Sequence, residues 1–124
     1  TTLQVTFQQE TAAYESLHSY NAQTRGVTLK PLAFAQPSST ADVAAVVTCA
    51  GSAGIRFTAR NGGHHYEANS LLAGGVVIDL LALQHIDIDE EEQTVVLGSG
   101  QEMVSGVGGV RLNRTLCSPQ HGSG

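Results

Sequence analysis

The chain has 124 residues, which is enough for one modest hydrophobic core, so we expect a single folded unit. Six basic residues against eleven acidic ones, with no run of Lys or Arg, argue against a nucleic-acid partner. The longest apolar runs are far too short to cross a bilayer, so we expect a soluble protein without membrane contact.

The opening segment to Gln23 is rich in Gln, Thr and Ala. Phe7, Tyr14 and Leu17 are spaced as on one face of a short amphipathic helix. Residues 31–35 follow as a short apolar run that predicts a strand.

The next element is a predicted helix that begins after Ser39. The Ser39 side chain is placed to cap the helix, and Asp42 stands three residues later, where it can reach back. Gly51 and Gly54 offer positions for the helix to end. One face should pack on a sheet, since it carries apolar residues at helical spacing: Val43, Val46, Val47 and Ala50.

Residues 55–59 alternate apolar and polar side chains and predict a second strand. Strand, helix and strand within about thirty residues have the size of a βαβ unit, so the two strands should be parallel. Residues 75–80 then form a β-branched run typical of a buried strand, and residues 86–89 and 94–97 flank the acidic stretch 90–92 like a hairpin. We expect an α+β fold in which the acidic stretch is a solvated turn.

From Gly98 the composition becomes glycine-rich without a clear period. Gly98-Ser99-Gly100 approaches the dinucleotide-binding fingerprint, but Met103 stands where the third glycine should be. We therefore divide the chain into residues 1–97 and a divergent tail, residues 98–124.

Because the sequence begins at Thr1, two alternatives remain open: a signal segment has been removed, or the sequence begins inside a longer gene product. Asn113-Arg114-Thr115 fits the glycosylation sequon and slightly favours secretion. Two cysteines, Cys49 and Cys117, leave open one disulfide or two thiols.

The segment that follows the second predicted strand is the candidate site, because open α/β sheets bind ligands at the carboxyl ends of their strands. Two adjacent glycines allow consecutive backbone N–H groups to form a concave anion site, for which a pyrophosphate is the natural guest. Arg60 could add a positive charge. The segment reads Arg60-Asn61-Gly62-Gly63-His64-His65-Tyr66.

Other chemistries are weaker. A nucleoside-triphosphate loop needs a lysine followed by Ser or Thr, and no lysine lies near this segment. A zinc site would have to bring distant residues together, because nothing in the spacing of His64, His65, His85, His121 and Cys117 imposes convergence. No Gly-x-Ser-x-Gly elbow is present. We expect no metal.

Taken in order, these pieces resemble the FAD-binding domain of the p-cresol methylhydroxylase and vanillyl-alcohol oxidase superfamily, especially its berberine bridge enzyme-like and oligosaccharide oxidase branch. The resemblance covers about two-thirds of the chain, and the order and spacing of the motifs are more specific than any one of them. It comprises residues 31–37 (first strand and proline), 39–54 ("DV" helix), 55–70 ("R-S-G-G-H-S-Y" flavin loop) and 75–97 ("VIDL" strand, "I-x-V-D" strand and hairpin).

The resemblance implies a flavin-dependent oxidoreductase in which Gly62, Gly63 and neighbouring amides hold the FAD pyrophosphate. It also implies that His64 is bonded covalently to the flavin methyl carbon, while His65 supports the loop. Asn61 replaces the usual serine and keeps a small polar side chain. The resemblance also implies a cofactor contact for Ser70, which ends the segment similar to the flavin loop.

The resemblance weakens after Gly98-Ser99-Gly100, which is similar to the family's "G-A-G" segment. Thr115-Leu116-Cys117-Ser118-Pro119 only loosely resembles the stretch whose cysteine makes a second flavin bond, and Cys117 lies closer to His64 than in the family. The family's substrate domain and catalytic base are not matched, so we name no catalytic residue.

Two readings follow. The first is the N-terminal portion of a secreted FAD-linked oxidase, as a fragment or a truncated product, which oxidises an alcohol or sugar by hydride transfer when complete. The second is a free-standing non-enzymatic module that keeps the flavin-domain scaffold for binding or assembly. In either case a short core should leave apolar surface exposed, which predicts self-association.

Overall fold

A four-stranded sheet with the order β1-β2-β4-β3 forms the centre of the protein. The computed structural model describes residues 3–9, 11–19, 29–65 and 67–102. The strands are β1 (Gln4–Phe7), β2 (Ala33–Gln36), β3 (Phe57–Arg60) and β4 (Val76–Asp79). β2 and β3 both run parallel to β4, which lies between them, whereas β1 is antiparallel to β2. The parallel strands therefore end at one common edge.

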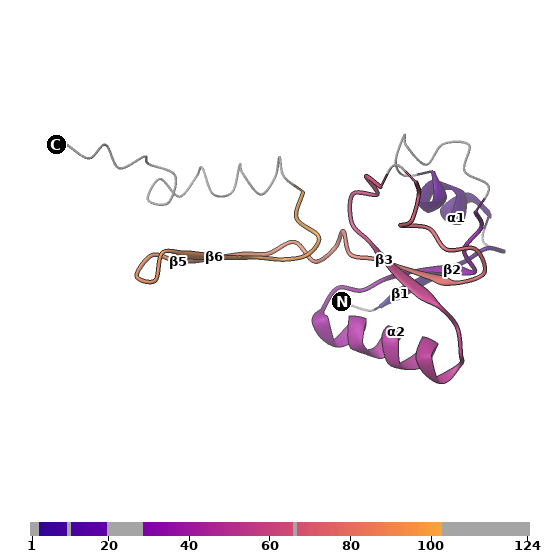
Figure 1. Ribbon diagram of the computed structural model, residues 1–124, viewed down its shortest axis with the longest axis horizontal. Coiled ribbons are helices and arrows are strands. Elements are labelled where there is room, and N and C mark those ends of the chain that lie inside the picture. Colours follow the sequence, from indigo (N-terminus) through magenta and orange to yellow (C-terminus); the bar gives the residue numbers. More distant parts are fainter. Residues whose placement is uncertain (1–2, 10, 20–28, 66, 103–124) are drawn as a thin grey trace.

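Two helices cover opposite faces of this sheet, α1 (Thr11–His18) above it and α2 (Thr40–Ser52) below it in Figure 1. The predicted cap of α2 is confirmed, because Ser39 Oγ accepts a hydrogen bond from Asp42 N at 3.1 Å. The helix ends at Ser52, and Gly54 follows with a φ of +67°, a conformation that favours glycine. Neither helix of the described ranges has the length and apolarity needed to cross a membrane.

Side-chain alternation along β2 and β4 supplies a core on each face of the sheet. Phe34 and Val77 point to the α1 face, where they pack with Tyr14 and Leu71. On the α2 face, Ala35 and Ile78 pack with Val46. The Tyr14 hydroxyl donates to Pro31 O at 2.6 Å, which satisfies the only polar atom of that buried ring.

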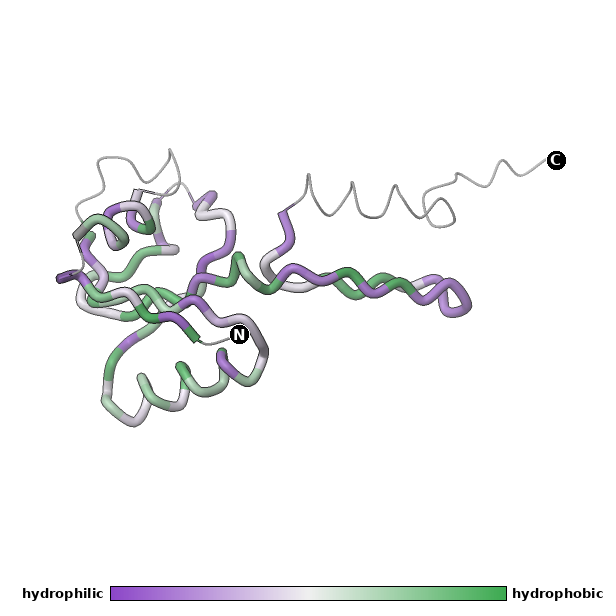
Figure 2. The backbone as a smooth tube through the Cα atoms, turned by 180° about the vertical axis from the view of Figure 1, so that it is seen from behind, coloured by the Kyte–Doolittle hydropathy of each residue, from purple (hydrophilic) through white to green (hydrophobic). Residues whose placement is uncertain are grey.

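The antiparallel hairpin of β5 (Ile86–Asp89) and β6 (Thr94–Leu97) has the predicted bounds and projects away from the two helices (Figure 1). Figure 2 shows a hydrophilic tip, and hydrophilic and hydrophobic stretches alternate along the rest of the hairpin. The acidic residues 90–92 form the exposed turn, as expected. Val96 keeps 58% of its surface exposed, so this two-stranded sheet has little apolar cover within the described residues.

The α+β class is confirmed, and three details add to or differ from the sequence-based prediction. Phe7 does not belong to the helix of Tyr14 and Leu17, because it ends β1 at the edge of the sheet. The βαβ strands β2 and β3 are parallel but not adjacent, since β4 pairs with both. On the predicted face of α2, Val46 and Ala50 are buried, whereas Val47 keeps 36% of its surface exposed.

Candidate functional site

The candidate site lies at the edge where β2, β4 and β3 end. Three segments leave the sheet there: residues 37–40, residues 80–85 and the glycine loop, residues 61–65. Because all three strands are parallel, their carboxyl ends lie side by side, which is where open sheets of this kind bind ligands. The position inferred from the sequence is therefore the one that the fold produces.

The glycine loop includes one backbone conformation that favours glycine. Gly62 and Gly63 are both buried, and Gly63 has a φ of +67°. A Cβ added to Gly62 would lie 2.8 Å from Cε1 of His64, so the imidazole ring lies directly over this glycine. The loop thus places a histidine ring next to a stretch of backbone that carries no side chains.

The two adjacent histidines have different surroundings. His65 is tied to its own turn: its Nδ1 accepts from Glu67 N at 3.2 Å, and its Nε2 lies 3.4 Å from Asn69 Nδ2. His64 is exposed, and no hydrogen bond or ion pair joins it to the other described residues. His65 therefore shapes the loop, whereas the His64 ring is available to a ligand.

Arg60 points away from the loop although it is the residue before Asn61. Its side chain is almost fully buried, where the guanidinium pairs with the Asp79 carboxylate and donates to Leu17 O at 2.7 Å. The guanidinium also lies 4.8 Å from the centre of the Phe34 ring. This geometry gives Arg60 a structural function between the sheet and α1, and a contact with pyrophosphate stays a prediction.

Asp79 is the residue of this edge that sequence reasoning did not single out. It is 1% exposed, and besides holding Arg60 it accepts from Leu81 N at 3.2 Å. The signal was present, because a lone carboxylate at the end of an apolar strand has to find a buried partner.

A second glycine-rich segment, residues 98–101, packs against the segment that follows β4. Gly98 N donates to His85 O at 2.8 Å, and Gly100 N donates to Leu83 O at 3.0 Å. Gly98-Ser99-Gly100 is thus a close-packing segment that leaves no space for a Cβ at its glycines. The Asn61 amide then links it to the glycine loop, since Nδ2 donates to Gln101 O at 3.0 Å.

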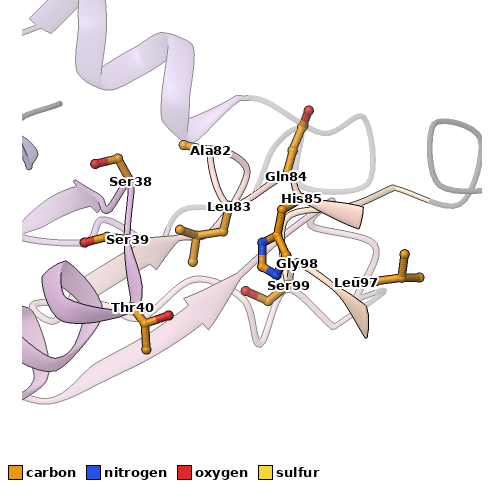
Figure 3. Close-up of a pocket in the computed structure, with 10 residues that line it drawn as sticks. All are labelled: Ser38, Ser39, Thr40, Ala82, Leu83, Gln84, His85, Leu97, Gly98 and Ser99. Carbon is orange, nitrogen blue, oxygen red and sulfur yellow. The ribbon is translucent and has the colours of Figure 1, made fainter. Parts of the chain in front are cut away.

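A hollow of about 340 Å³ lies beside this segment, between the start of α2 and the base of the hairpin (Figure 3). Two hydrogen bonds from Ser38 to the Asp42 carboxylate hold the pKa of that carboxyl below its ordinary value. The hollow therefore has a carboxylate near one wall, which disfavours a phosphate there. Its lining residues are Ser38, Ser39, Thr40, Ala82, Leu83, Gln84, His85, Leu97, Gly98 and Ser99.

The two remaining predicted site residues are Ser70 and Cys117. Ser70 is half-buried in the connection between β3 and β4, after Asn69, whose carbonyl accepts from Thr58 Oγ1 at 3.3 Å. Cys117 lies outside the described residues. Within those residues, no group of three or more His, Cys, Asp or Glu side chains could hold a metal ion.

A glycine loop at the carboxyl edge of parallel strands, with buried glycines and an exposed imidazole, is typical of domains that bind a phosphate-bearing cofactor. The family model described as "FAD binding domain" matches residues 31–111 and spans β2, α2, the loop and the hairpin. The chain therefore belongs to this FAD-binding family, and FAD is its cofactor. The two consecutive glycines fit that group, because neither carries a side chain of its own that would keep a pyrophosphate away from the backbone.

Similar proteins place the chain in the expected branch. It is 41% identical over 69 residues to the FAD-linked oxidoreductase pytB of Aspergillus terreus, covering 56% of this chain and 8% of that protein. Glucooligosaccharide oxidase of Sarocladium strictum is 30% identical over 73 residues, covering 57% of this chain and 15% of the oxidase. The solved structure of wild-type Physcomitrella patens BBE-like 1 superposes with a TM-score of 0.69 at 31% identity, covering 79% of this chain and 21% of that one.

The resemblance to berberine bridge enzyme-like and oligosaccharide oxidase proteins is thereby confirmed. The chain spans less than a quarter of each of these three relatives. The matched part is the N-terminal portion of an FAD-binding domain, in agreement with the pieces recognised in the sequence.

Proposed function

We propose that this chain is the FAD-binding portion of an oxidoreductase that oxidises an alcohol or a sugar by hydride transfer to the flavin. The observation that carries the proposal is the exposed His64 ring over Gly62, inside the stretch that the FAD-binding family model matches. A sugar or alcohol substrate is supported by the similarity to glucooligosaccharide oxidase. Because the chain spans only 15% of that oxidase, turnover requires parts of a longer protein.

Within the site, the glycine loop and the hollow take different parts of the cofactor. Amides of Gly62 and Gly63 bind the pyrophosphate, whereas the hollow beside Asp42 suits an uncharged end of the molecule. When bound, FAD supplies the hydride acceptor. The protein contributes orientation, since the loop is fixed by the His65 turn on one side and by the Asn61 to Gln101 hydrogen bond on the other.

We propose that His64 holds the flavin covalently. The exposed imidazole of His64 would provide the nitrogen that bonds to the flavin methyl carbon, and this bond would keep the cofactor in the site. The exposure of His64, in contrast to the bonded His65, makes it the nucleophile.

The test is the intact mass of the denatured chain after incubation with FAD, together with its visible absorption spectrum. We expect a flavin adduct in the unchanged chain and in His65→Ala, and its loss in His64→Ala with the thermal midpoint retained. An adduct that survives His64→Ala and disappears in His65→Ala would show that the other imidazole is the attachment point. If FAD binds to none of these proteins, the non-enzymatic binding or assembly module becomes the better explanation.

Cys117 is proposed as a second attachment point on the loose resemblance of residues 115–119 to the family's cysteine-containing stretch. Replacing Cys117 with Ala should then leave a flavin attached through His64 alone and change its absorption spectrum. An unchanged spectrum, or a disulfide between Cys49 and Cys117 found by peptide mapping, would remove it from the site.

Self-association is proposed from an apolar groove between α2 and the outer part of the sheet. The groove has a volume of about 430 Å³ and includes Phe7 and Leu32, which keep 48% and 40% of their surface exposed. Light scattering should show dimers or larger species that a Phe7→Ser and Leu32→Ser double variant reduces. A monomer at high concentration would contradict this proposal.

Two further assignments are proposals from the sequence. The boundary between residues 1–97 and the tail at 98–124 follows from the change in composition at Gly98. Secretion is supported by the sequon at Asn113, and a glycan lost on deglycosylation of the secreted protein would test it.

A further inference from the structure

Asn61 is held in one orientation between the two glycine-rich segments. Its Nδ2 donates to Gln101 O at 3.0 Å. A backbone oxygen accepts only, so the amide nitrogen has to face it and the amide oxygen has to face away. One hydrogen bond thus decides which atom of Asn61 lies toward the rest of the site.

The Oδ1 atom of Asn61 is buried and accepts no hydrogen bond from the described residues. Native proteins leave few such acceptors unsatisfied, because each one costs free energy. The chain continues directly into two buried glycines, which carry no side chain that could donate to Oδ1. Because Oδ1 of Asn61 is buried beside a backbone that a ligand can approach closely, we expect its hydrogen-bond donor to belong to the ligand.

The chemistry of FAD narrows the choice of donor. Phosphate oxygens at neutral pH only accept hydrogen bonds, so a pyrophosphate on Gly62 and Gly63 leaves Oδ1 unsatisfied. Between that pyrophosphate and the ring that reaches His64, FAD carries the ribityl chain with its hydroxyl donors. We infer that Asn61 Oδ1 accepts a hydrogen bond from a ribityl hydroxyl and so positions the polyol between the phosphates and the ring. This inference rests on the proposed function.

The test measures reversible binding by titration calorimetry of the full chain in a His64→Ala background, with FAD and ADP as ligands. ADP has the pyrophosphate and lacks the ribityl chain. We expect Asn61→Leu to weaken FAD binding roughly tenfold while ADP binding changes by less than about twofold. Gln4→Leu is the matched control, an exposed amide on β1 at the edge of the sheet opposite β3, and should change neither affinity.

Parallel weakening of FAD and ADP by Asn61→Leu would mean that the residue only shapes the loop, and an unchanged FAD affinity would also overturn the inference. Asn61→Ser keeps a small polar group and serves if the Leu variant does not fold, with the same selective loss expected to a smaller degree. If the His64→Ala chain binds neither FAD nor ADP, the proposed function fails together with the inference. Normal FAD binding without a selective loss removes the inference alone.

Discussion

The buried pair of Arg60 and Asp79 provides the sharpest test of the fold, because it joins the ends of β3 and β4 beneath the glycine loop. The side chains keep 1% and 0% of their surface exposed. Replacing Asp79 with Ala leaves the guanidinium without its carboxylate in a place that water does not reach. Breaking such a pair from one side costs about 3–5 kcal/mol.

That loss is large for this protein. Domains of this size are stable by about 5–15 kcal/mol, so Asp79→Ala should remove at least about a fifth of the stability. The expected fall in thermal midpoint is on the order of 10–25 °C, measured by circular dichroism or scanning calorimetry. A double variant, Arg60→Met with Asp79→Leu, should recover much of the loss because it leaves no buried charge.

The control is the exposed pair of Lys30 and Glu15, whose atoms lie 2.8 Å apart. Solvent screens this pair, so Glu15→Gln should leave the thermal midpoint almost unchanged. Two results would contradict the buried pair: a loss in Asp79→Ala as small as that in Glu15→Gln, or a loss in the double variant equal to the sum of the losses in Arg60→Met alone and Asp79→Leu alone. Either result would mean that the pair is not buried as a unit.

Three further outcomes follow from single positions. Gly98→Ala should cost about 1–3 kcal/mol by thermal unfolding, because its Cβ would lie 2.1 Å from Leu83 O, and an unchanged midpoint would contradict the close packing. Gly62→Ala should displace the His64 ring and lower the yield of flavin adduct in the intact mass with little change in stability. Asp42→Ala should lower the thermal midpoint above the ordinary Asp pKa. Hydrogen bonds from Ser38 lower the pKa of the folded-state carboxyl, so the difference should disappear as the pH falls through that lowered value, and a constant difference would contradict it.

The local elements could be read from the sequence because their signals are local. Ser39 and Asp42 mark the start of α2, Gly54 marks its end, and apolar alternation on both sides of an acidic turn gives the hairpin its correct bounds. The glycine loop was likewise placed correctly at a strand end, since the glycine pair directly follows the alternating apolar and polar residues of the predicted strand.

The order of the strands could not be predicted from the sequence, because strand pairing depends on contacts between residues far apart in the chain. β1 is only four residues long and is a strand because it pairs with β2. That pairing leaves no local signal, and the spacing of Phe7 and Tyr14 therefore suggested a helix. The insertion of β4 between β2 and β3 is decided by which apolar faces fit together, and no local pattern records it.

For the site, the sequence determined the residue types of the loop, and the tertiary structure decided their directions. Adjacent positions such as Arg60 and Asn61 face opposite ways along an extended chain, so the guanidinium reaches Asp79 while the amide reaches Gln101. The same holds for His64 and His65, one exposed over Gly62 and the other bonded into its turn. These partners lie up to 40 residues away along the chain, and only the folded sheet edge brings them within hydrogen-bonding distance.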